Sequence, residues 1–315
     1  MKIKKILKSF YTYITDSDYR FLINEGFGIY KNLGDVEFTK RKFRIRMGYE
    51  LNLSNPQTFN EKLQWLKLFD HNPAYTKMVD KYEAKKYVEG MIGSQYIIPT
   101  LGIWNRPEDI NWNSLPNQFV LKVTHDSGGI IICRDKSKLD KKEAIKELKR
   151  SLKTDYYSIH REWPYKDVTR RIIAEKYMQD NKSIDLKDYK FYCFNGVPRF
   201  LYVSEGLANH KTAKVIFITT DWIRAPFARD DFQSFSEVPP KPKQFDKMMR
   251  LARVLAEKHP FLRVDFYEIN GNVFFGELTF CPCAGMMHFN PPEYDQIIGD
   301  MLILPKEKIK GGKRE

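Results

Sequence analysis

Cysteine is scarce in this sequence. The 315 residues include only Cys133, Cys193, Cys281 and Cys283, and a chain of this length can bury a stable core without disulfide bonds. Cys281 and Cys283 are separated by a single proline, whereas the common zinc knuckles use a two-residue gap. We therefore expect four reduced thiols, with neither a disulfide framework nor a zinc knuckle.

Long apolar runs are also missing. No stretch approaches the roughly 18 consecutive apolar residues that a membrane-spanning helix requires. The N-terminus is basic, but it lacks the continuous apolar segment and the small-residue cleavage site of a secretory signal. These absences predict a cytoplasmic protein.

The basic residues are not distributed as in a nucleic-acid-binding domain. The chain has 53 Lys and Arg against 40 Asp and Glu, a net charge of +13, but most of the excess lies in residues 1–46 and 306–315. The central part shows no basic stripe with aromatic residues between the charges. We therefore predict no nucleic-acid partner. Hydrophobic residues make up 42% of the sequence, which is enough for one large or two modest domains.

Residues 1–14 have the pattern of a basic amphipathic helix. Apolar residues recur at helical spacing and lysines lie between or beside them; the two sets are Ile3, Ile6, Leu7, Phe10 and Ile14, and Lys2, Lys4, Lys5 and Lys8. Such a helix either binds weakly to an anionic membrane surface or packs its apolar side on the body of the protein. The sequence leaves both alternatives open.

Two further helices are predicted before residue 90. Thr58 followed by Glu61 is the capping-box signature of a helix start, and apolar residues between Leu63 and Phe69 form the buried side of that helix. A second helix is expected from about Pro73 to Glu89, because glycines follow it.

Segment 119–132 predicts a hairpin that can contact an anion. An apolar strand carries Lys122, a polar loop with Gly128 and Gly129 follows, and a second apolar strand returns. Backbone N–H groups at such a tip can approach a phosphate closely. The segment is not a P-loop, because the lysine precedes the glycines. Taken alone, the pattern also fits a lysine that faces solvent.

A second hairpin brings two carboxylates together. Apolar strands at 261–266 and 273–279 flank a turn at Asn270-Gly271, so Asp265 and Glu277 are expected side by side. Two carboxylates in apolar strands are costly unless a cation lies between them, and hard oxygen ligands favour Mg²⁺ shared with a nucleotide phosphate. The alternative cation is Arg263, which lies on the same strand face as Asp265.

The order of these motifs resembles the ATP-grasp superfamily, and in particular its teichuronopeptide-biosynthesis (TupA-like) branch. The resemblance covers roughly residues 45–305. Besides 119–129, it depends on Val79-Asp80-Lys81, 172–178, 188–191, Arg263-Val264-Asp265, Glu277-Leu278-Thr279 and 281–285. It implies an α+β fold in which two α+β subdomains clasp ATP behind a helical N-terminal region.

The resemblance also implies a division of the chain. The expected parts are a basic helical region (1–70), a pre-grasp segment (71–105), a small subdomain with the glycine loop (106–174), a C-terminal subdomain with the metal site (175–305) and a basic tail (306–315).

Roles for individual residues follow from the same resemblance. The phosphates of ATP would be held by Lys81, Lys122, His125, Ser127, Gly128 and Gly129. Glu175 and the backbone groups of Lys176, Tyr177 and Met178 would lie at the adenine, and Asp188 at the ribose. The metal ligands would be Asp265, Glu277 and Thr279, where Thr279 replaces the usual Asn and is a poorer ligand. Arg263 would stabilise a developing oxyanion, Lys190 would contact phosphate during the reaction, and Gly285 would offer a backbone anion contact.

The implied activity is an ATP-dependent carboxylate–amine ligase that acts through an acyl phosphate in bacterial surface-polysaccharide biosynthesis. Its expected cofactors are ATP and Mg²⁺, and its substrates are a sugar or uronic acid and an amine or amino acid. Two alternatives remain: a glycosyltransferase, although no Rossmann-like glycine fingerprint occurs, and an ATP-dependent sugar phosphotransferase. Residues 1–14 would hold the protein at the inner face of the cytoplasmic membrane if their helix binds lipid.

Overall fold

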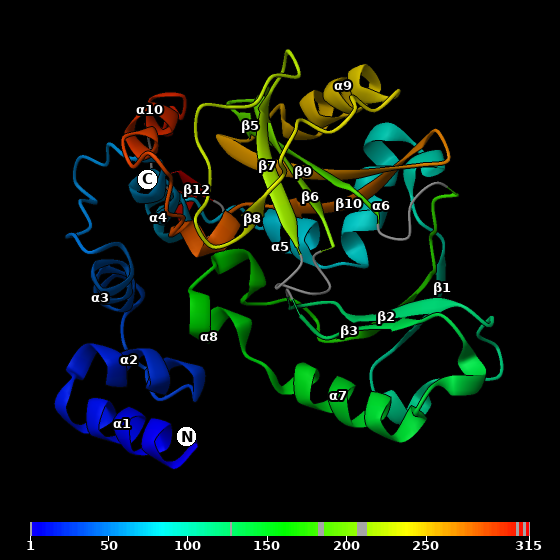
Figure 1. Cartoon of the computed structure of the whole chain (residues 1–315), viewed down its shortest axis with the longest axis horizontal. Coiled ribbons are helices and arrows are strands. Elements are labelled where there is room, and N and C mark those ends of the chain that lie inside the picture. Colours follow the sequence, from blue (N-terminus) through cyan, green and yellow to red (C-terminus); the bar gives the residue numbers. More distant parts are fainter. Residues whose placement is uncertain are drawn as a thin grey trace.

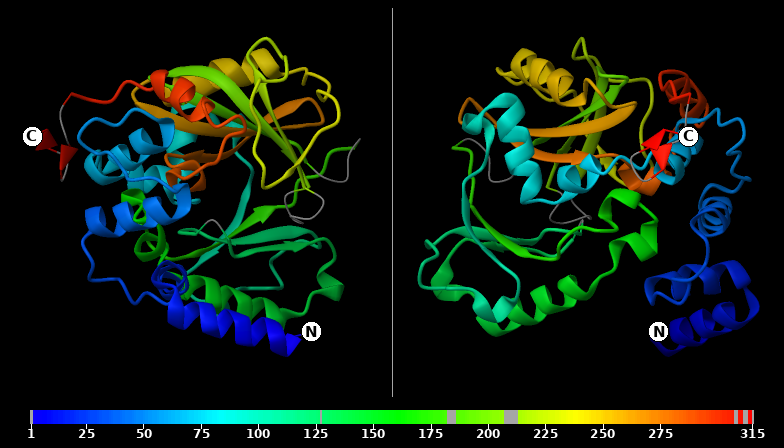
Figure 2. Two further views of the ribbon diagram at one scale, coloured as in Figure 1. Left: turned by 60° about the vertical axis from the view of Figure 1, so that its left-hand side comes forward. Right: turned by 180° about the vertical axis from the view of Figure 1, so that it is seen from behind.

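The computed structural model describes residues 2–126, 128–181, 186–206, 213–306, 309–310 and 313–314. It contains one body built on a four-stranded sheet and another built on a six-stranded sheet, with a group of N-terminal helices at one side (Figure 1). Figure 2 shows the same arrangement from two further directions. The predicted α+β fold class with a helical N-terminal region is confirmed.

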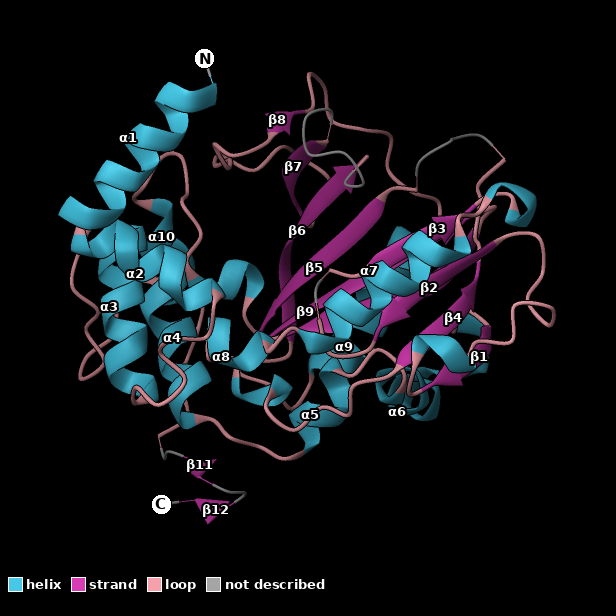
Figure 3. Cartoon of the chain, turned by 90° about the horizontal axis from the view of Figure 1, so that it is seen from below, coloured by secondary structure: helices cyan, strands magenta, loops and turns pink. Residues whose placement is uncertain are grey.

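Three helices form the N-terminal group: α1 (Lys2–Thr15), α2 (Ser17–Gly26) and α3 (Asp35–Met47). Figure 3 shows them gathered at one end of the molecule. Phe21 of α2 and Phe38 of α3 are buried together, with ring centroids 5.3 Å apart. Helix α1 confirms the helix predicted at the N-terminus, but its Phe10 and Ile14 are more than half exposed. These two side chains are therefore not packed on the body of the protein.

Helix α4 (Phe59–Phe69) begins at the predicted capping box. The Thr58 hydroxyl accepts from the N–H of Glu61, and the Glu61 carboxylate accepts from the N–H of Thr58. The helix does not belong to the N-terminal group, although the expected region 1–70 includes it. Its Phe59 ring lies 5.1 Å from that of Phe261 in the six-stranded sheet, and α10 (Tyr294–Asp300) packs beside it.

After α4 the chain forms two helices where the sequence predicts one. Helix α5 (Ala74–Val79) and helix α6 (Glu83–Ile92) are separated at Asp80, whose ψ of 116° lies outside the helical region. The Asp80 carboxylate accepts from the N–H groups of Tyr82 (2.8 Å) and Glu83 (3.2 Å) and so starts the second helix. The predicted continuous helix from Pro73 to Glu89 is therefore wrong, because this side-chain cap competes with continuation of the helix.

The four-stranded sheet is antiparallel and has the order β1-β4-β2-β3. Its strands are β1 (Thr100–Trp104), β2 (Phe119–Val123), β3 (Ile130–Cys133) and β4 (Ile172–Lys176). Strands β2 and β3 form the predicted hairpin. Helix α7 (Lys141–Lys153) covers one face and packs Leu148 on Phe119, Leu121 and Val123, and the short α8 (Tyr156–His160) follows it. Strand β1 comes from the expected pre-grasp segment, and the expected boundary at residue 174 falls inside β4.

The six-stranded sheet has the order β10-β9-β5-β6-β7-β8 and is antiparallel except for the pair β7–β8. Its strands are β5 (Asp188–Phe194), β6 (Val197–Glu205), β7 (Lys214–Thr219), β8 (Gln233–Ser234), β9 (Phe261–Ile269) and β10 (Asn272–Thr279). Neighbouring residues of β5 face opposite cores. Phe191 packs with α6 and α9 (Phe245–Ala256), whereas Tyr192 packs with α4 and α10. Helices therefore cover both faces of this sheet.

The remaining elements are short. Short 3-10 helices lie at Ser94–Tyr96, Pro107–Asp109, Lys136–Lys138, Trp163–Tyr165 and Pro282–Gly285. In the expected basic tail, β11 (Ile309–Lys310) pairs with β12 (Lys313–Arg314). The four cysteines are free thiols. None of the helices that the structure describes is both long and apolar enough to cross a membrane.

Candidate active site

A cluster of ion pairs connects the four-stranded sheet to helix α6. Glu175 of β4 lies opposite Val120 of β2, and Lys122, two residues further along β2, shares its face of the sheet. The Nζ of Lys122 lies 2.7 Å from one oxygen of Glu175, and the Nζ of Lys85 in α6 lies 2.6 Å from the other. Glu175 and Lys85 are buried, so one carboxylate joins two strands and a helix.

The cluster keeps Glu175 ionised. Burial raises the pKa of this carboxyl, but the ammonium groups of Lys122 and Lys85 outweigh burial and lower its pKa to about 2. Burial lowers the pKa of Lys122, and Glu175 more than compensates and raises it. At Lys85 the effect of burial exceeds that of Glu175, so the pKa of Lys85 is lowered. Lys122 is therefore a firmly charged cation, and a quarter of its side chain is exposed to an incoming anion.

The break between α5 and α6 places Lys81 beside the glycine loop. The backbone N–H of Lys81 donates to the carbonyl of Thr124 (3.1 Å), and its Nζ donates to the carbonyl of Asp126. Arg171 supports the break, because its guanidinium pairs with the Asp80 carboxylate at 2.8 Å. The residue predicted to reach phosphate is thus held at the base of the loop.

The glycine loop at 124–129 is described except for Ser127, so the prediction for that residue lies outside the described residues. The N–H of Gly128 donates to the Asp126 carboxylate at 3.0 Å. Gly129 has a φ of +61°, and a Cβ there would lie 2.8 Å from the side chain of Ser151 and 2.9 Å from that of Val123. Glycine is required at this position, since a larger residue would both clash and strain the backbone.

His125 is turned toward the end of α7. Its ring is buried, and Nε2 lies 3.1 Å from the carbonyl oxygen of Thr154. Burial and the charge of Arg170 lower the pKa of His125. This geometry gives His125 a role in holding the loop, and it does not support the predicted phosphate contact.

A cavity of about 240 Å³ lies between the two sheets. One side is formed by Lys122, Glu175 and the segment 176–178, and the other by Asp188 of β5 and Tyr267 of β9. Apolar residues complete the lining, among them Ile98, Val120, Ile130 and Ile132. The N–H of Lys176 donates to the carbonyl of Pro99 at 3.0 Å. This N–H is one of the backbone groups predicted to bind adenine, and it already has a partner in the protein.

The second predicted cluster lies at the β9–β10 hairpin. Asn270 and Gly271 form the predicted turn, with φ of 52° and 78°. The register of the hairpin shifts beside Gly276, where a Cβ would lie 3.1 Å from the backbone carbonyl of Asp265. Asp265 and Glu277 thus meet across the hairpin, but through a β-bulge that the sequence does not predict.

Arg263 bridges the two carboxylates. Its Nε and Nη2 donate to the two oxygens of Asp265 at 2.8 and 2.7 Å, and Nη2 also donates to Glu277 at 2.5 Å. The Thr279 hydroxyl donates to the same Glu277 oxygen at 3.3 Å. The three predicted metal ligands therefore lie together, and the arginine that the sequence offers as the alternative cation contacts both of their carboxylates.

Lys190 completes this cluster from β5. It pairs in register with Asp265, and its Nζ lies 3.1 Å from that carboxylate and 3.2 Å from the carboxylate of Asp188. Burial lowers the pKa of Lys190, but these two carboxylates raise it well above its usual value. At Glu277 the effect of burial is outweighed by Arg263, Lys190 and Lys81, which lower the pKa to about 2. Burial raises the pKa of Asp265 despite Arg263 and Lys190, so the charged forms are favoured at Glu277 and Lys190 and less so at Asp265.

The two clusters act on each other across the cavity. After burial and Glu175, the carboxylates of Glu277 and Asp188 also raise the pKa of Lys122. Lys122 on one sheet thus faces carboxylates and an arginine on the other, with an apolar pocket beside them. Such a space can accommodate a flat apolar ring, a chain of anionic groups and a reacting carboxylate.

Sequence reasoning missed Lys85, Arg171 and Tyr267. Tyr267 lies two residues after Asp265 in one strand, so strand alternation could have placed it at the site. The sequence around Lys85 and Arg171 gives no signal that distinguishes a residue in a buried ion pair from an exposed one.

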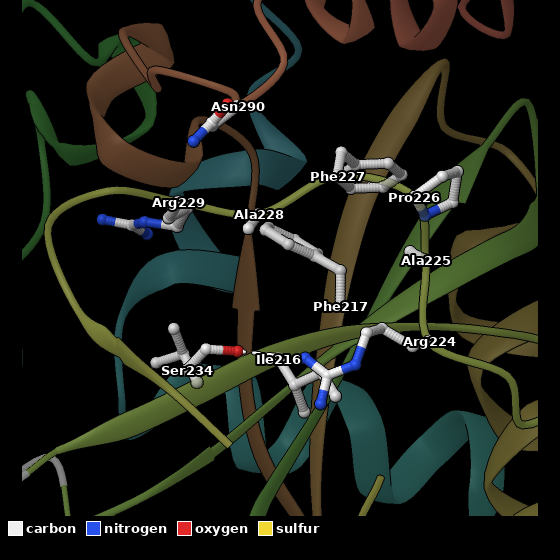
Figure 4. Close-up of a pocket in the computed structure, with 11 residues that line it drawn as sticks. Ile216, Phe217, Arg224, Ala225, Pro226, Phe227, Ala228, Arg229, Ser234 and Asn290 are labelled. Atoms are coloured by element: carbon white, nitrogen blue, oxygen red, sulfur yellow. Dashed lines mark hydrogen bonds between the residues drawn. The ribbon is translucent and has the colours of Figure 1, made fainter. Parts of the chain in front are cut away.

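The cavities beside the six-stranded sheet include two that are not lined by any predicted site residue. One of about 700 Å³ is lined by Arg229, Cys283, Met286 and His288, among others. The other, of about 180 Å³, lies along β7, where Phe217 and Phe227 form part of its wall (Figure 4).

Comparison with protein families identifies the class of this protein. A family model described as "TupA-like ATPgrasp" matches residues 61–303, which is most of the chain. The chain therefore belongs to the TupA-like ATP-grasp family. This membership confirms the predicted family and fold, and the predicted class of enzyme, an ATP-grasp ligase.

Solved structures of ATP-grasp proteins are similar to this chain at low identity. The D-alanine–D-alanine ligase from Helicobacter pylori is 12% identical with a TM-score of 0.44, over 78% of this chain and 69% of that chain. The corresponding ligase from Bacillus anthracis is 17% identical with a TM-score of 0.40, over 78% and 69%. A RimK domain ATP-grasp protein from Sphaerobacter thermophilus is 9% identical with a TM-score of 0.40, over 79% and 72%. Scores this low add no argument to the family match, and no curated protein matched the chain.

Proposed function

We propose that the protein is an ATP-dependent carboxylate–amine ligase that works through an acyl phosphate. The observation that carries the proposal is the cavity between the sheets, where Lys122 of one sheet lies near enough to Glu277 of the other for their charges to interact. Glu277 in turn contacts Arg263. Phosphoryl transfer depends on positioning and on charge stabilisation, and cations placed around one space supply both.

ATP would bind in this cavity with its adenine among the apolar side chains and the segment 176–178. Asp188 would contact the ribose. Lys81 and Lys122 would hold the phosphates, together with the backbone N–H of Gly129 and, once it leaves the Asp126 carboxylate, that of Gly128. Both lysines are already fixed by protein contacts, so little order would have to be created when the nucleotide binds.

The chemistry has two steps. An oxygen of the substrate carboxylate attacks the γ-phosphorus of ATP, the bond between this phosphorus and the β–γ bridging oxygen breaks, and ADP leaves. The amine nitrogen then attacks the carbonyl carbon of the acyl phosphate, inorganic phosphate leaves, and the nitrogen loses a proton. Arg263 would donate to the oxyanion of the tetrahedral intermediate, since a guanidinium offers two donors in fixed geometry. Lys190, held between Asp188 and Asp265, would contact the transferred phosphoryl group.

Asp265, Glu277 and Thr279 fit Mg²⁺ in donor type, because carboxylate oxygens are the hard ligands that this ion prefers. Within the described ranges, no group of three or more His, Cys, Asp or Glu side chains could hold a metal ion by itself. An ion held by Asp265, Glu277 and Thr279 would therefore need further ligands, which nucleotide phosphates can supply. When bound, Mg²⁺ would neutralise charge on the phosphate oxygens.

The proposed substrates are a uronic acid and an amine or amino acid, joined during the assembly of a bacterial surface polysaccharide. Membership in the TupA-like family supports this assignment, because the resemblance links the branch to surface-polysaccharide assembly. The site residues themselves require only a carboxylate and an amine.

We also propose that α1 contacts the anionic inner face of the cytoplasmic membrane. Phe10, Tyr11 and Ile14 are more than half exposed, which argues against the alternative in which the apolar side of the helix packs on the protein. Lysines at positions 2, 4, 5 and 8 add positive charge to the same helix. Exposed apolar side chains together with lysines are the features that bind a helix to an anionic lipid surface.

The experiment that tests the ligase proposal is a matrix of uronic acids and amino acids incubated with Mg-ATP. Release of ADP and phosphate should require an acid and an amine together, and the product mass should equal their sum less one water. Lys122→Met should abolish this release. Lys149→Met is the matched control, because Lys149 is an exposed lysine of the same subdomain that pairs with Glu108.

Two other outcomes would contradict the ligase. Transfer of the phosphoryl group to a sugar hydroxyl, without free phosphate, would indicate a phosphotransferase. Sugar transfer from a nucleotide sugar without consumption of ATP would indicate a glycosyltransferase.

A further inference from the structure

Three consecutive residues after β10 have left-handed backbone conformations. Cys283, Ala284 and Gly285 have φ of 54°, 55° and 70°. Residues with a Cβ adopt this region rarely and at a cost in free energy, so such a turn persists only where other contacts hold it. The turn begins four residues after Thr279, which pairs in register with Arg263. Burial raises the pKa of the Cys283 thiol, and the charge of Arg263 is among the effects that oppose this rise, so the turn lies near the acidic cluster.

Gln64 of α4 makes two hydrogen bonds to this turn. The Nε2 of Gln64 donates to the carbonyl of Ala284 at 3.0 Å and to the carbonyl of Gly285 at 2.6 Å. Gln64 is completely buried. Its amide oxygen is buried without a hydrogen-bond partner, and the reversed amide would place that oxygen against the two carbonyl oxygens. The side chain therefore serves as a donor to the turn.

Two neighbours on the same face of α4 extend the contact. Asn60 donates to the carbonyl of Met287 and accepts from its N–H, both at 2.8 Å. The Nζ of Lys67 lies 3.4 Å from the carbonyl of Ala284. Asn60, Gln64 and Lys67 are spaced by four and three residues, which places them on one side of a helix. This side of α4 therefore makes hydrogen bonds along the segment from Ala284 to Met287.

Helix α4 and the turn lie very close together at Gly285. A Cβ at Gly285 would lie 2.5 Å from the Nε2 of Gln64 and 3.1 Å from the Cβ of Leu63. Gly285 and Gln64 therefore fit each other, and neither can change in size without displacing the other.

We propose that Gln64 is a positioning residue of the active site: by binding the carbonyls of Ala284 and Gly285 it keeps the left-handed turn in place beside Arg263. The inference deepens the proposed ligase function and rests on it for its catalytic consequence. In that reaction the turn would lie beside the acyl group whose oxyanion Arg263 would stabilise, and a displaced turn would slow acyl transfer without weakening the binding of ATP.

The test compares Gln64→Met with Lys62→Met. Both variants place methionine in α4 and remove a donor to two backbone carbonyls, because Lys62 donates to Gly299 at 2.8 Å and to Leu302 at 3.0 Å. Of these two residues, Gln64 contacts the turn and Lys62 does not. Hydrogen–deuterium exchange of a peptide that spans residues 281–289 reports the turn directly, because the N–H groups of Ala284, Met286 and Met287 are hydrogen-bonded in the folded protein.

In Gln64→Met, exchange at the turn should be about tenfold faster or more, and the rate of ADP release with the best acid and amine pair should fall about tenfold or more. The KM for ATP and the affinity for a non-hydrolysable ATP analogue should stay unchanged. In Lys62→Met, exchange should increase at 299–302 and not at the turn.

Unchanged exchange at the turn in Gln64→Met would overturn the proposal, as would faster exchange with an undiminished rate of ligation. A wild-type protein that releases no ADP with any pair would contradict the proposed function instead, and exchange at the turn would still show whether Gln64 holds it.

Discussion

Lys122 and Glu175 form an ion pair of 2.7 Å across the neighbouring strands β2 and β4. The same carboxylate binds Lys85 of α6 at 2.6 Å. The lysine proposed to meet the phosphates is therefore fixed by the protein before any nucleotide arrives. Preorganised charge of this kind costs no rearrangement at the moment of reaction, which is why it is effective in catalysis.

Loss of the shared carboxylate should destabilise the fold. In Glu175→Gln the buried Lys85 loses its counter-charge, and breaking a buried ion pair costs about 3 kcal/mol of unfolding free energy. Urea denaturation at pH 7 measures the change. Glu143→Gln removes an exposed pair with Lys146 and should change stability by less than about 1 kcal/mol. Equal stability of the two variants would show that Glu175 is not structurally important.

The contribution of Glu175 should depend on pH. Its folded-state pKa of about 2 lies below the ordinary value of 4.5, so the unfolded chain takes up the proton first as pH falls. The stabilisation is therefore complete above about pH 4.5 and is lost as pH falls toward 2. The difference in unfolding free energy between wild type and Glu175→Gln should shrink across this range. A difference that stays constant from pH 7 to pH 3 would contradict the low pKa.

Local sequence signals account for much of the fold. The capping box at Thr58 and the turn at Asn270-Gly271 specify backbone geometry through adjacent residues, and both could be predicted. The break at Asp80 could not, because the Asp80 carboxylate is also held by Arg171, a partner 91 residues away. The bulge at Gly276 likewise depends on a close approach to the backbone of Asp265.

The charged residues of the site were easier to predict than Asn60 and Gln64, the neutral residues that hold the turn beside it. Lys122 and Asp265 stand out because each interrupts an apolar strand. Asn60 and Gln64 are polar residues in a helix, where the usual expectation is exposure to solvent. Both are completely buried, because this side of α4 packs against the chain from Ala284 to Met287, a placement that only the tertiary structure decides.

The magnesium dependence of nucleotide binding tests the acidic cluster. Glu277→Gln should raise the Mg²⁺ concentration for half-maximal binding of an ATP analogue by about tenfold, because a charged ligand is lost. Thr279→Asn should lower that concentration, since an amide carbonyl is a better ligand than a hydroxyl. Glu293→Gln, an exposed change on the same body, should have no effect. The metal assignment fails if Glu277→Gln binds the analogue with wild-type dependence on Mg²⁺.

Membrane contact through α1 can be measured by flotation with vesicles. Wild-type protein should float with vesicles that contain anionic lipid and not with neutral ones, and added salt should reduce the binding. Removal of residues 1–14, or the double change Phe10→Ser and Ile14→Ser, should abolish flotation while Mg-ATP binding is kept. Flotation of the truncated protein at the wild-type level would locate the contact elsewhere, and its absence from wild type would remove the contact altogether.

Isothermal titration with a non-hydrolysable ATP analogue and Mg²⁺ tests the central claim most directly, with nucleotide sugars titrated in parallel. Wild type and Lys149→Met should bind the analogue with the same micromolar affinity, and Lys122→Met should bind it about tenfold more weakly or not at all. Binding of a nucleotide sugar without binding of the ATP analogue would contradict the ligase and favour a glycosyltransferase.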